Sequence, residues 1–261
     1  MTIVKHELRR GRMQLMIWTA SVGALLAVCV LLFPEMKGEM EQVSGVFASM
    51  GSFTKAFGMD RLDFGTLIGF YGVECGNVLG LGGAFFASLL GIAALASEES
   101  GRTAEFLLTH PVTRARVIAE KLVAVLVQVL IFNAVIALIA VGCIRLIGEP
   151  LPVKELMLLH TAYLVMQIEL TLICFGLSAC LRRGAMGVGL GLATVMYFLN
   201  LVANITDSAS WLKYVTPFGY TESADIVSAG QLDAGMIALG LAIGVVIAAA
   251  GSLYYARRDI Q

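Results

Sequence analysis

Six long runs of apolar residues alternate with shorter polar segments along the chain. The runs cover residues 15–33, 67–96, 117–147, 156–181, 187–205 and 233–256. An α-helix needs about 20 residues to cross ~30 Å of hydrocarbon, and each run comes close to or exceeds that length. The pattern predicts an all-α polytopic membrane protein, a single transmembrane domain over residues 1–261 with six spanning helices.

Two amphipathic segments accompany the predicted spans. In residues 1–12 the apolar side chains share one helical face and the basic side chains the other, which is typical of a short helix lying in the membrane interface. Residues 34–65 also carry apolar side chains at helical spacing but are too polar to span. This connection is predicted to be either a lid over the mouth of the bundle or a helix that seals against the other spans.

Small and aromatic residues refine the picture. Glycines recur at spacings of three and four in two runs, at Gly69, Gly72, Gly76, Gly80 and Gly83, and at Gly240 and Gly244. Such positions allow close approach of helix backbones in lipid. The polar loop 206–232 holds Trp211, Tyr214, Phe218 and Tyr220, which suit an aromatic belt at the membrane interface.

Composition agrees with a membrane protein surrounded by lipid. Hydrophobic residues make up 58% and charged residues 14%, against about 25% charged in soluble domains. No basic run suggests nucleic acid as a partner. The five cysteines fall within apolar runs without CxxC spacing, which predicts small buried side chains rather than a disulfide or a metal site.

The distribution of basic residues predicts the orientation. Six spans place both termini, the segment 97–116 and the turn at 182–184 on one side. That side carries twelve of the eighteen Lys and Arg residues: Lys5, Arg9, Arg10, Arg12, Arg102, Arg114, Arg116, Lys121, Arg182, Arg183, Arg257 and Arg258. The positive-inside rule therefore predicts cytoplasmic N- and C-termini in a cell membrane. The opposite side carries six bases and eleven acids.

The polar segment Ser97–Lys121 separates the second and third runs. It contains four acids and four bases around an apolar triplet at residues 106–108. A short helix is expected over residues 97–109, ended by Pro111, and Thr113 is a suitable N-cap for the next helix. A short helix rigidly joined to two spans is suited to transmit force from a partner protein.

Two acids lie well inside predicted spans, Glu74 and Glu169. An ionisable side chain at membrane depth is costly and by default suggests a transport pathway. Together with Asn77 they are our candidates for a translocation path. The alternative, which stays open, is that each is protonated or bonds a polar neighbour; the available partners are Asn77, Gln128, Asn133 and Gln167.

The sequence holds no convincing catalytic set. There is no GxxxxGK[ST] phosphate-binding loop, and the three histidines are scattered. Residues 98–102 read EESGR, one residue short of the EExxxR pattern of CAAX-type proteases, so an intramembrane protease is only a remote alternative. We expect no enzymatic activity, metal or cofactor on this chain.

The segment between the second and third runs resembles the signature of ABC-2 type transporter permeases. That signature has the form E-(x)-GT-x-E-x-L-L-x-x-P-x-[ST]-R-x-x-[IVL]-x-x-K-L. The matching residues here are Glu98, Glu99, Gly101, Arg102, Thr103, Glu105, Leu107, Leu108, Pro111, Thr113, Arg114, Val117, Lys121 and Leu122. Arg102 departs from the pattern because it separates Gly101 from Thr103. The stretch 211–218, WLKYVTPF, and the closing residues 254–259, YYARRD, are also similar to the family.

The resemblance implies partners and a role. Such permeases form a dimer of identical or homologous membrane subunits with two ABC ATP-binding subunits, which hold the ATP and Mg. It implies that residues 1–12 form an elbow helix and that the cytoplasmic coupling helix docks on the ATPase. The implied ATPase-coupling residues are Glu98, Glu99, Arg102, Thr103, Glu105, Phe106, Leu107, Leu108, Pro111 and Arg114. Most members export their substrate; the alternative is a mechanotransmission or sensor module acting on a membrane or periplasmic partner, with which the acidic outer loops are compatible.

Overall fold

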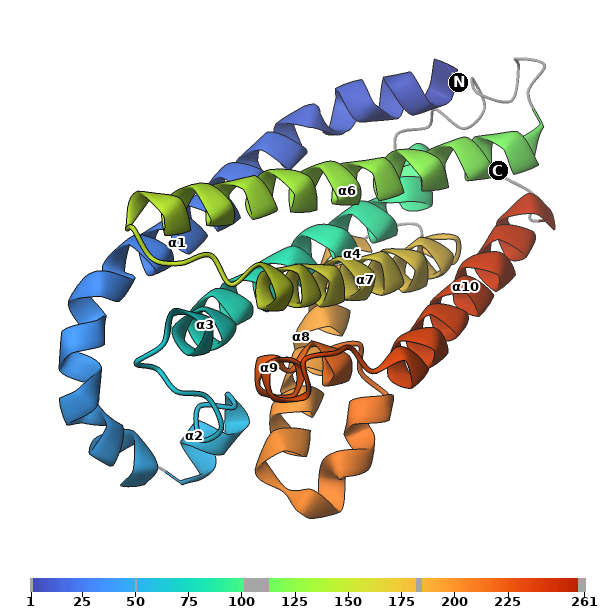
Figure 1. The fold of residues 1–261 in the computed structure, drawn as a ribbon. Coiled ribbons are helices and arrows are strands. Elements are labelled where there is room, and N and C mark those ends of the chain that lie inside the picture. The colour runs from blue at the N-terminus through green and yellow to red at the C-terminus, as the bar shows by residue number, and fades with distance from the viewer. Residues whose placement is uncertain (1, 50, 101–112, 182–184, 258–261) are drawn as a thin grey trace.

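The computed structural model describes residues 2–49, 51–100, 113–181 and 185–257, and long helices running side by side dominate it (Figure 1). No strand occurs in these ranges. The elements are α1 (Thr2–Ser49), α2 (Ser52–Ala56), α3 (Leu67–Phe70), the π-helix η1 (Tyr71–Cys75), α4 (Gly76–Ser100), α6 (Arg114–Leu146), α7 (Val153–Ser178), α8 (Ala185–Ile205), the 3₁₀-helices η2 (Asp207–Tyr214) and η3 (Gly219–Thr221), α9 (Ser223–Ala229) and α10 (Ala234–Arg257).

Six helical units are long and apolar enough to cross a membrane, as the sequence predicts. They are α1, the continuous α3–η1–α4 unit, α6, α7, α8 and α10. From the second span onward, the ends of the helices lie within four residues of the ends of the apolar runs. The chain is therefore an all-helical, multi-pass membrane protein.

The first helix differs from the prediction. α1 is one continuous helix of 48 residues, so the predicted elbow over residues 1–12 forms its first turns and is not a separate helix. The helix also continues through Pro34, where the sequence suggests an exit. A proline removes one backbone hydrogen bond and bends a helix without having to end it, and α1 changes direction along its second half (Figure 1).

The connection 34–65 therefore consists of the end of α1, the short helix α2 and a turn before α3. α2 packs against the end of α8, where the Asn204 side-chain amide donates to the carbonyl oxygen of Ala56 at 3.2 Å. α2 thus packs against a neighbouring span, and the lid or seal over the whole connection stays a prediction.

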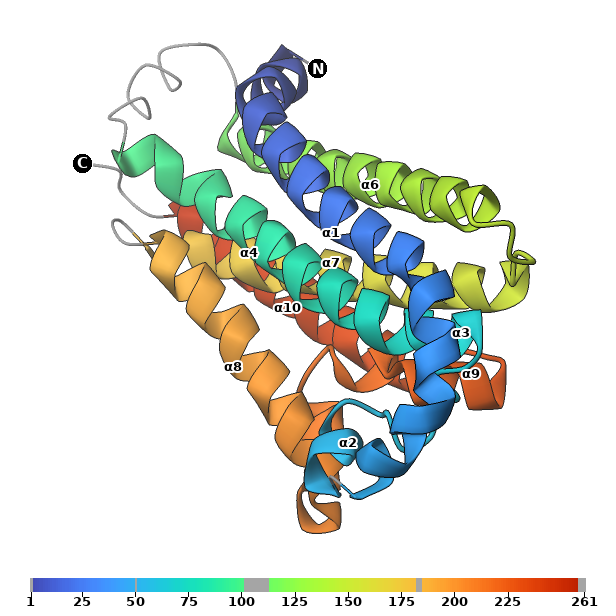
Figure 2. The same ribbon diagram turned by 90° about the vertical axis from the view of Figure 1, so that its left-hand side faces the viewer.

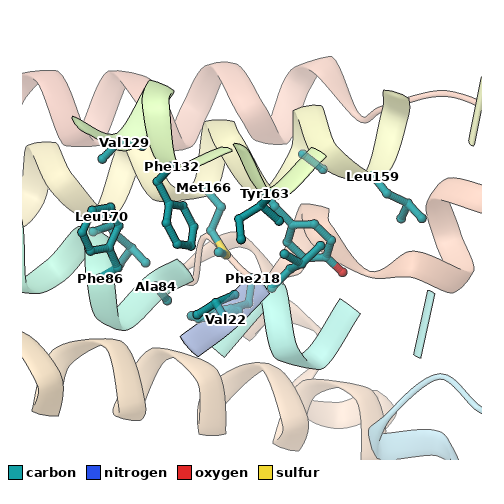
Figure 3. Packing of buried hydrophobic residues seen from close by; sticks show 14 of the residues in the cluster. Val22, Ala84, Phe86, Val129, Phe132, Leu159, Tyr163, Met166, Leu170 and Phe218 are labelled. Carbon is teal, nitrogen blue, oxygen red and sulfur yellow. The ribbon is translucent and has the colours of Figure 1, made fainter. Parts of the chain in front are cut away.

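The centre of the bundle is α7, which lies between α4 and α10 (Figure 2). Its buried side chains interdigitate with those of α4 and α6. Phe86 and Phe132 stack with ring centroids 4.7 Å apart, close to Met166 and Leu170 (Figure 3). α1 and α6 pack on each other and complete the far side of the core.

Glycines set how closely α7 approaches both neighbours. A Cβ atom on Gly251 of α10 would overlap the backbone carbonyl of Gly176, and one on Gly91 of α4 would lie 2.5 Å from the carbonyl oxygen of Thr171. The predicted packing positions Gly83 and Gly240 are likewise filled by α7 side chains, Gln167 and Glu169. The stripe does not extend to the start of the second span, where Gly69 packs on the preceding turn.

The cysteines agree with the sequence interpretation in part. All five are free; Cys75 and Cys174 are buried, and Cys29 and Cys143 are half-buried. Cys180 is exposed at the end of α7, because the helix stops at Ser178, before the predicted boundary at residue 181.

Adding one methyl group at Gly251 should separate α10 from α7. We expect Gly251→Ala to lower the free energy of unfolding by about 1–3 kcal/mol, the usual cost of overpacking a close contact. The measurement is thermal unfolding of the purified protein in detergent. Gly142→Ala on α6 is the matched control, since a Cβ there meets nothing within 4 Å and the higher helix propensity of Ala should raise stability by about 0.5–1 kcal/mol. Equal midpoints for the two variants would contradict this account of the α7–α10 contact.

Candidate functional site

Both chain termini lie at one end of the bundle, and α2 and α9 lie at the other, which we call the distal end (Figures 1 and 2). Residues 207–229, comprising η2, η3 and α9, form a cap on the distal end of the spans. Two cavities lie beneath this distal cap, and the cap and several spans contribute side chains to each of them.

The distal cap is held by side chains that point inward. Phe218 and Tyr220 are buried, whereas Trp211 and Tyr214 are exposed. The predicted aromatic belt is therefore wrong for Phe218 and Tyr220. These two residues insert between the spans instead, as Phe218 beside Tyr163 illustrates (Figure 3).

The first cavity, which we call the polar chamber, lies between α4, α7, α8 and the distal cap and has a volume of about 40 Å³. The Tyr197 hydroxyl donates to Asn77 Oδ1 at 3.1 Å. The hydroxyls of Tyr163 and Ser223 are hydrogen-bonded at 3.1 Å, and Gly76 leaves room for them. The polar side chains of its wall are Asn77, Tyr163, Tyr197, Asn200, Thr221, Glu222 and Ser223.

Glu222 is the only acid in this wall, and four groups surround its carboxyl. Only 9% of its side-chain surface is exposed. Oε2 accepts a hydrogen bond from Asn204 Nδ2 at 2.7 Å, and Oε1 lies 3.8 Å from Arg61 Nη2. Arg61 also pairs with Asp225, which lies 3.7 Å from Lys213 Nζ.

Burial raises the pKa of the Glu222 carboxyl above its ordinary value, and the charge of Asp225 adds to this rise. The hydrogen bond from Asn204 and the positive charges of Arg61 and Lys213 act in the opposite direction without cancelling it. Taking the carboxylate out of water is therefore the larger effect. The folded protein holds this proton more tightly than the unfolded chain does.

The second cavity, the apolar chamber, lies between α7, α8, α10 and the distal cap and measures about 80 Å³. Glu169 is its one acid and is only 4% exposed. The Tyr220 hydroxyl donates to Glu169 Oε2 at 2.7 Å, and Gly240 leaves the space that the carboxyl group fills. Much of the remaining wall is aliphatic, with Ile173, Leu239 and Ile243.

The structure does not bring the three candidate path residues into one space. Asn77 lines the polar chamber and Glu169 lines the apolar chamber. Glu74 is half-buried in η1, within electrostatic range of the Cys29 thiol of α1, and lines neither chamber. The suggested partners Asn133 and Gln167 bond each other at 2.8 Å.

Sequence reasoning missed most of the polar chamber. Tyr197, Asn200 and Asn204 follow one another at spacings of three and four near the end of the fifth span, and this polar face was the available signal. No signal in the sequence pointed to Glu222, because its partners Asn204 on α8 and Arg61 before α3 are remote from it in the sequence.

At the other end of the bundle, α1 and α6 are joined by what we call the α1–α6 latch. Lys121 Nζ lies 2.9 Å from Glu7 Oε1, and the lysine side chain is only 2% exposed. Glu120 Oε2 accepts from the backbone amides of Ile3 and Val4 at 3.2 and 3.4 Å. A carboxylate at a helix N-terminus is favourable because amide donors there lack helical partners.

The predicted coupling region is described only at its edges. Residues 101–112, with the coupling candidates Arg102, Thr103, Glu105, Phe106, Leu107, Leu108 and Pro111, lie outside the described residues. Glu98 and Glu99 belong to the last turn of α4. Thr113 is the N-cap of α6, as predicted, and accepts from the Arg116 amide. Arg114 Nη1 donates to the carbonyl oxygen of Ala256 at 3.4 Å.

Within the described residues, no group of three or more His, Cys, Asp or Glu side chains is placed to hold a metal ion. His160 of α7 has its Nε2 2.8 Å from the Tyr71 hydroxyl.

Six span-length helices with small polar cavities at one end define a membrane component of transport type. The chain belongs to the ABC-2 family of transporter proteins, whose family model, described as ABC-2 family transporter protein, matches residues 1–260. No curated protein matches the sequence. The resemblance seen in residues 98–122 is thereby extended to nearly the whole chain, and a permease-type membrane component is the class to which it belongs.

Removing the hydroxyl of Tyr220 should leave the Glu169 carboxyl buried without its donor. We expect Tyr220→Phe to lower the free energy of unfolding by about 1–3 kcal/mol, the cost of an unsatisfied buried polar group. Tyr214→Phe, on the exposed face of the same distal cap, should change it by no more than about 0.5 kcal/mol. Thermal unfolding in detergent compares the two, and similar midpoints would argue against an anchoring role for Tyr220.

The raised pKa of Glu222 predicts a pH dependence of stability. A group whose pKa is raised by folding stabilises the protein fully below its unfolded pKa, and this stabilisation is lost as pH rises through the folded value. The unfolding midpoint, measured in choline chloride buffer, should therefore fall as the pH is raised from about 4, the ordinary range of a Glu side chain. In the Glu222→Gln variant, the part of this decrease in the unfolding midpoint that comes from Glu222 should disappear. A pH profile unchanged by Glu222→Gln would show that the carboxyl titrates alike in both states.

Proposed function

We propose that this chain is the membrane-spanning permease subunit of an ATP-driven exporter and couples to a separate ABC ATP-binding subunit. The observation that carries the proposal is the family match over residues 1–260 together with the signature between Glu98 and Leu122, which joins the second and third spans. The chain has no phosphate-binding loop of its own. ATP and Mg are therefore assigned to the partner.

Coupling is proposed to act through the segment that precedes Thr113 in the sequence. This segment contains most of the residues that match the family's coupling helix. α6 begins directly after it, and Lys121, two turns into α6, is paired with Glu7 of α1. A force applied before Thr113 would therefore act on two spans together, which suits a transmission element.

The energetics of such a subunit rest on differential binding. An ATPase dimer that closes on ATP shifts the permease between two conformations only if it binds one of them more tightly. Two permease subunits and two ATP-binding subunits make up the proposed complex, with both termini and the coupling segment in the cytoplasm. Substrate would leave on the side of the distal cap.

The proposed translocation path includes Asn77 and Glu169, with Glu74 nearer to α1. Asn77 and Glu169 each line a chamber beneath the distal cap, at the end where export would release the substrate. Opening of the cap between the two chambers would connect them. Glu222 favours a cationic group in the polar chamber, whereas in the apolar chamber Lys213 lines the wall together with Glu169.

The acidic distal loops, which would suit a mechanotransmission partner, are partly neutralised within the chain. Glu149 pairs with Lys37 at 2.9 Å, and Asp225 pairs with Arg61 and Lys213. This internal pairing leaves less charge for an external partner, so export is the function that we propose.

Charge reversal in the coupling segment tests the proposal. The tagged chain is co-expressed with ABC ATP-binding subunits of the same genome, and co-purification and ATP hydrolysis are measured. We expect Glu98→Lys combined with Glu99→Lys to reduce recovery of the ATPase, or the stimulation of its hydrolysis by the permease, at least tenfold, because the docking charges change sign.

The matched control is Asp60→Lys combined with Asp207→Lys, which reverses two exposed acids at the distal end. It should leave both readouts unchanged. Full co-purification and normal hydrolysis with the Glu98/Glu99 variant would overturn the assignment of this segment to ATPase coupling. Failure of the wild-type chain to associate with any ABC ATPase would overturn the proposed function.

A further inference from the structure

Asn200, one of the residues that line the polar chamber, carries a buried amide oxygen without a partner among the described residues. Asn200 is only 7% exposed, lines the chamber, and its Oδ1 has no hydrogen-bond partner among the described residues. Buried polar atoms in native proteins are nearly always paired with protein, water or an ion. The chamber is the space beside Asn200 from which a partner can come.

The wall of the polar chamber is rich in oxygen. Its lining residues include Glu222, Tyr163, Ser223 and Asn200, whose side chains carry a carboxyl group, two hydroxyls and an amide oxygen. No Lys, Arg or His side chain is among its described lining residues. Carboxylate, hydroxyl and amide oxygens suit hard cations rather than soft metals, and the carboxylate disfavours anions.

Asn204, on the same face of α8 as Asn200, holds the Glu222 carboxylate in place. Asn204 Nδ2 donates both to Glu222 Oε2 at 2.7 Å and to the carbonyl oxygen of Ala56 at 3.2 Å. Glycines keep the surrounding space open: a Cβ on Gly76 would lie 2.7 Å from the Tyr163 hydroxyl and 3.0 Å from Ser223 Oγ. Oxygen-bearing residues of α7, α8 and the distal cap thus line one cavity.

The volume of the polar chamber and the charge of its lining residues limit the kinds of ligand that it can bind. A cavity must offer about 10–15 Å³ to hold one water molecule, so about 40 Å³ admits a small ion with one or two waters and excludes an organic substrate. The single carboxylate already lies 3.8 Å from the Arg61 guanidinium. Ca²⁺ takes six to eight oxygen ligands and Mg²⁺ dehydrates reluctantly, so one partly compensated carboxylate fits a single positive charge.

We propose that the polar chamber binds one monovalent cation of the size of Na⁺, held by Asn200 Oδ1, the Glu222 carboxylate and the hydroxyl oxygens of Tyr163 and Ser223. The cation joins α7 and α8 to the distal cap. This inference does not depend on the proposed export function, because it concerns the isolated chain.

The test uses the purified full chain in detergent, without an ATPase or substrate. Unfolding midpoints are measured in NaCl, KCl or choline chloride at constant ionic strength, and ²²Na⁺ binding is measured directly. We expect a saturable rise of the midpoint with NaCl, a smaller rise with KCl, and one bound Na⁺ per chain. A ligand that binds only the folded state raises stability in this concentration-dependent way.

Asn200→Leu keeps the side-chain volume but removes the amide oxygen, and we expect it to weaken Na⁺ binding at least tenfold. Thr194→Val is the matched control on α8, because the Thr194 hydroxyl bonds only its own helix, at the Leu190 carbonyl; its Na⁺ affinity should equal that of the wild type. If Asn200→Leu does not fold, Glu222→Gln decides, with the same tenfold loss expected.

Three results would overturn the proposal. One is an identical unfolding midpoint in NaCl and choline chloride together with no ²²Na⁺ binding, which would mean that the chamber holds only water. Another is equal stabilisation by Na⁺ and K⁺, which would contradict a Na⁺-sized site. The third is unchanged ²²Na⁺ affinity in a folded Asn200→Leu or Glu222→Gln variant.

Discussion

The close approach of α7 to both α4 and α10 is the contact on which the rest of this bundle depends. Helices in lipid gain little from hydrophobic burial against each other, so van der Waals contact at small residues has to hold them together. Here the glycines also create the space for polar side chains: Gly83 faces Gln167, Gly240 faces Glu169, and Gly76 faces Tyr163. Packing and polar chemistry in this protein therefore use the same positions.

The distal cap turns these positions into enclosed cavities. Phe218 fills the space between the spans, while Tyr220 and Ser223 reach the α7 side chains Glu169 and Tyr163. On its outer side the cap is tied by the alternating charges of Arg61, Glu222, Asp225 and Lys213. A cap fixed by both hydrogen bonds inside and ion pairs outside can close each chamber with a segment of about twenty residues.

The spacing of residues along the chain predicted those parts of the fold that depend on neighbouring residues in the sequence. The six apolar runs, the N-cap at Thr113 and the packing glycine Gly240 follow from spacing alone and agree with the structure. Spacing could not reveal that α1 continues through Pro34, because a proline can either end or bend a helix. It also could not reveal Glu222 or the inward turn of Tyr220, since their partners are remote in sequence. The coupling helix over residues 101–112 stays a prediction.

The unbroken length of α1 gives the molecule a mechanical connection between its two ends. Forty-eight residues at 1.5 Å each make a helix with a contour of about 70 Å, and Glu7 near its start is fastened to Lys121. Two residues separate its other end from α2, whose last residue, Ala56, accepts a hydrogen bond from Asn204 beside the polar chamber. α1 therefore links the α1–α6 latch to the helix that borders the polar chamber, along a path that does not run through the tightly packed α7.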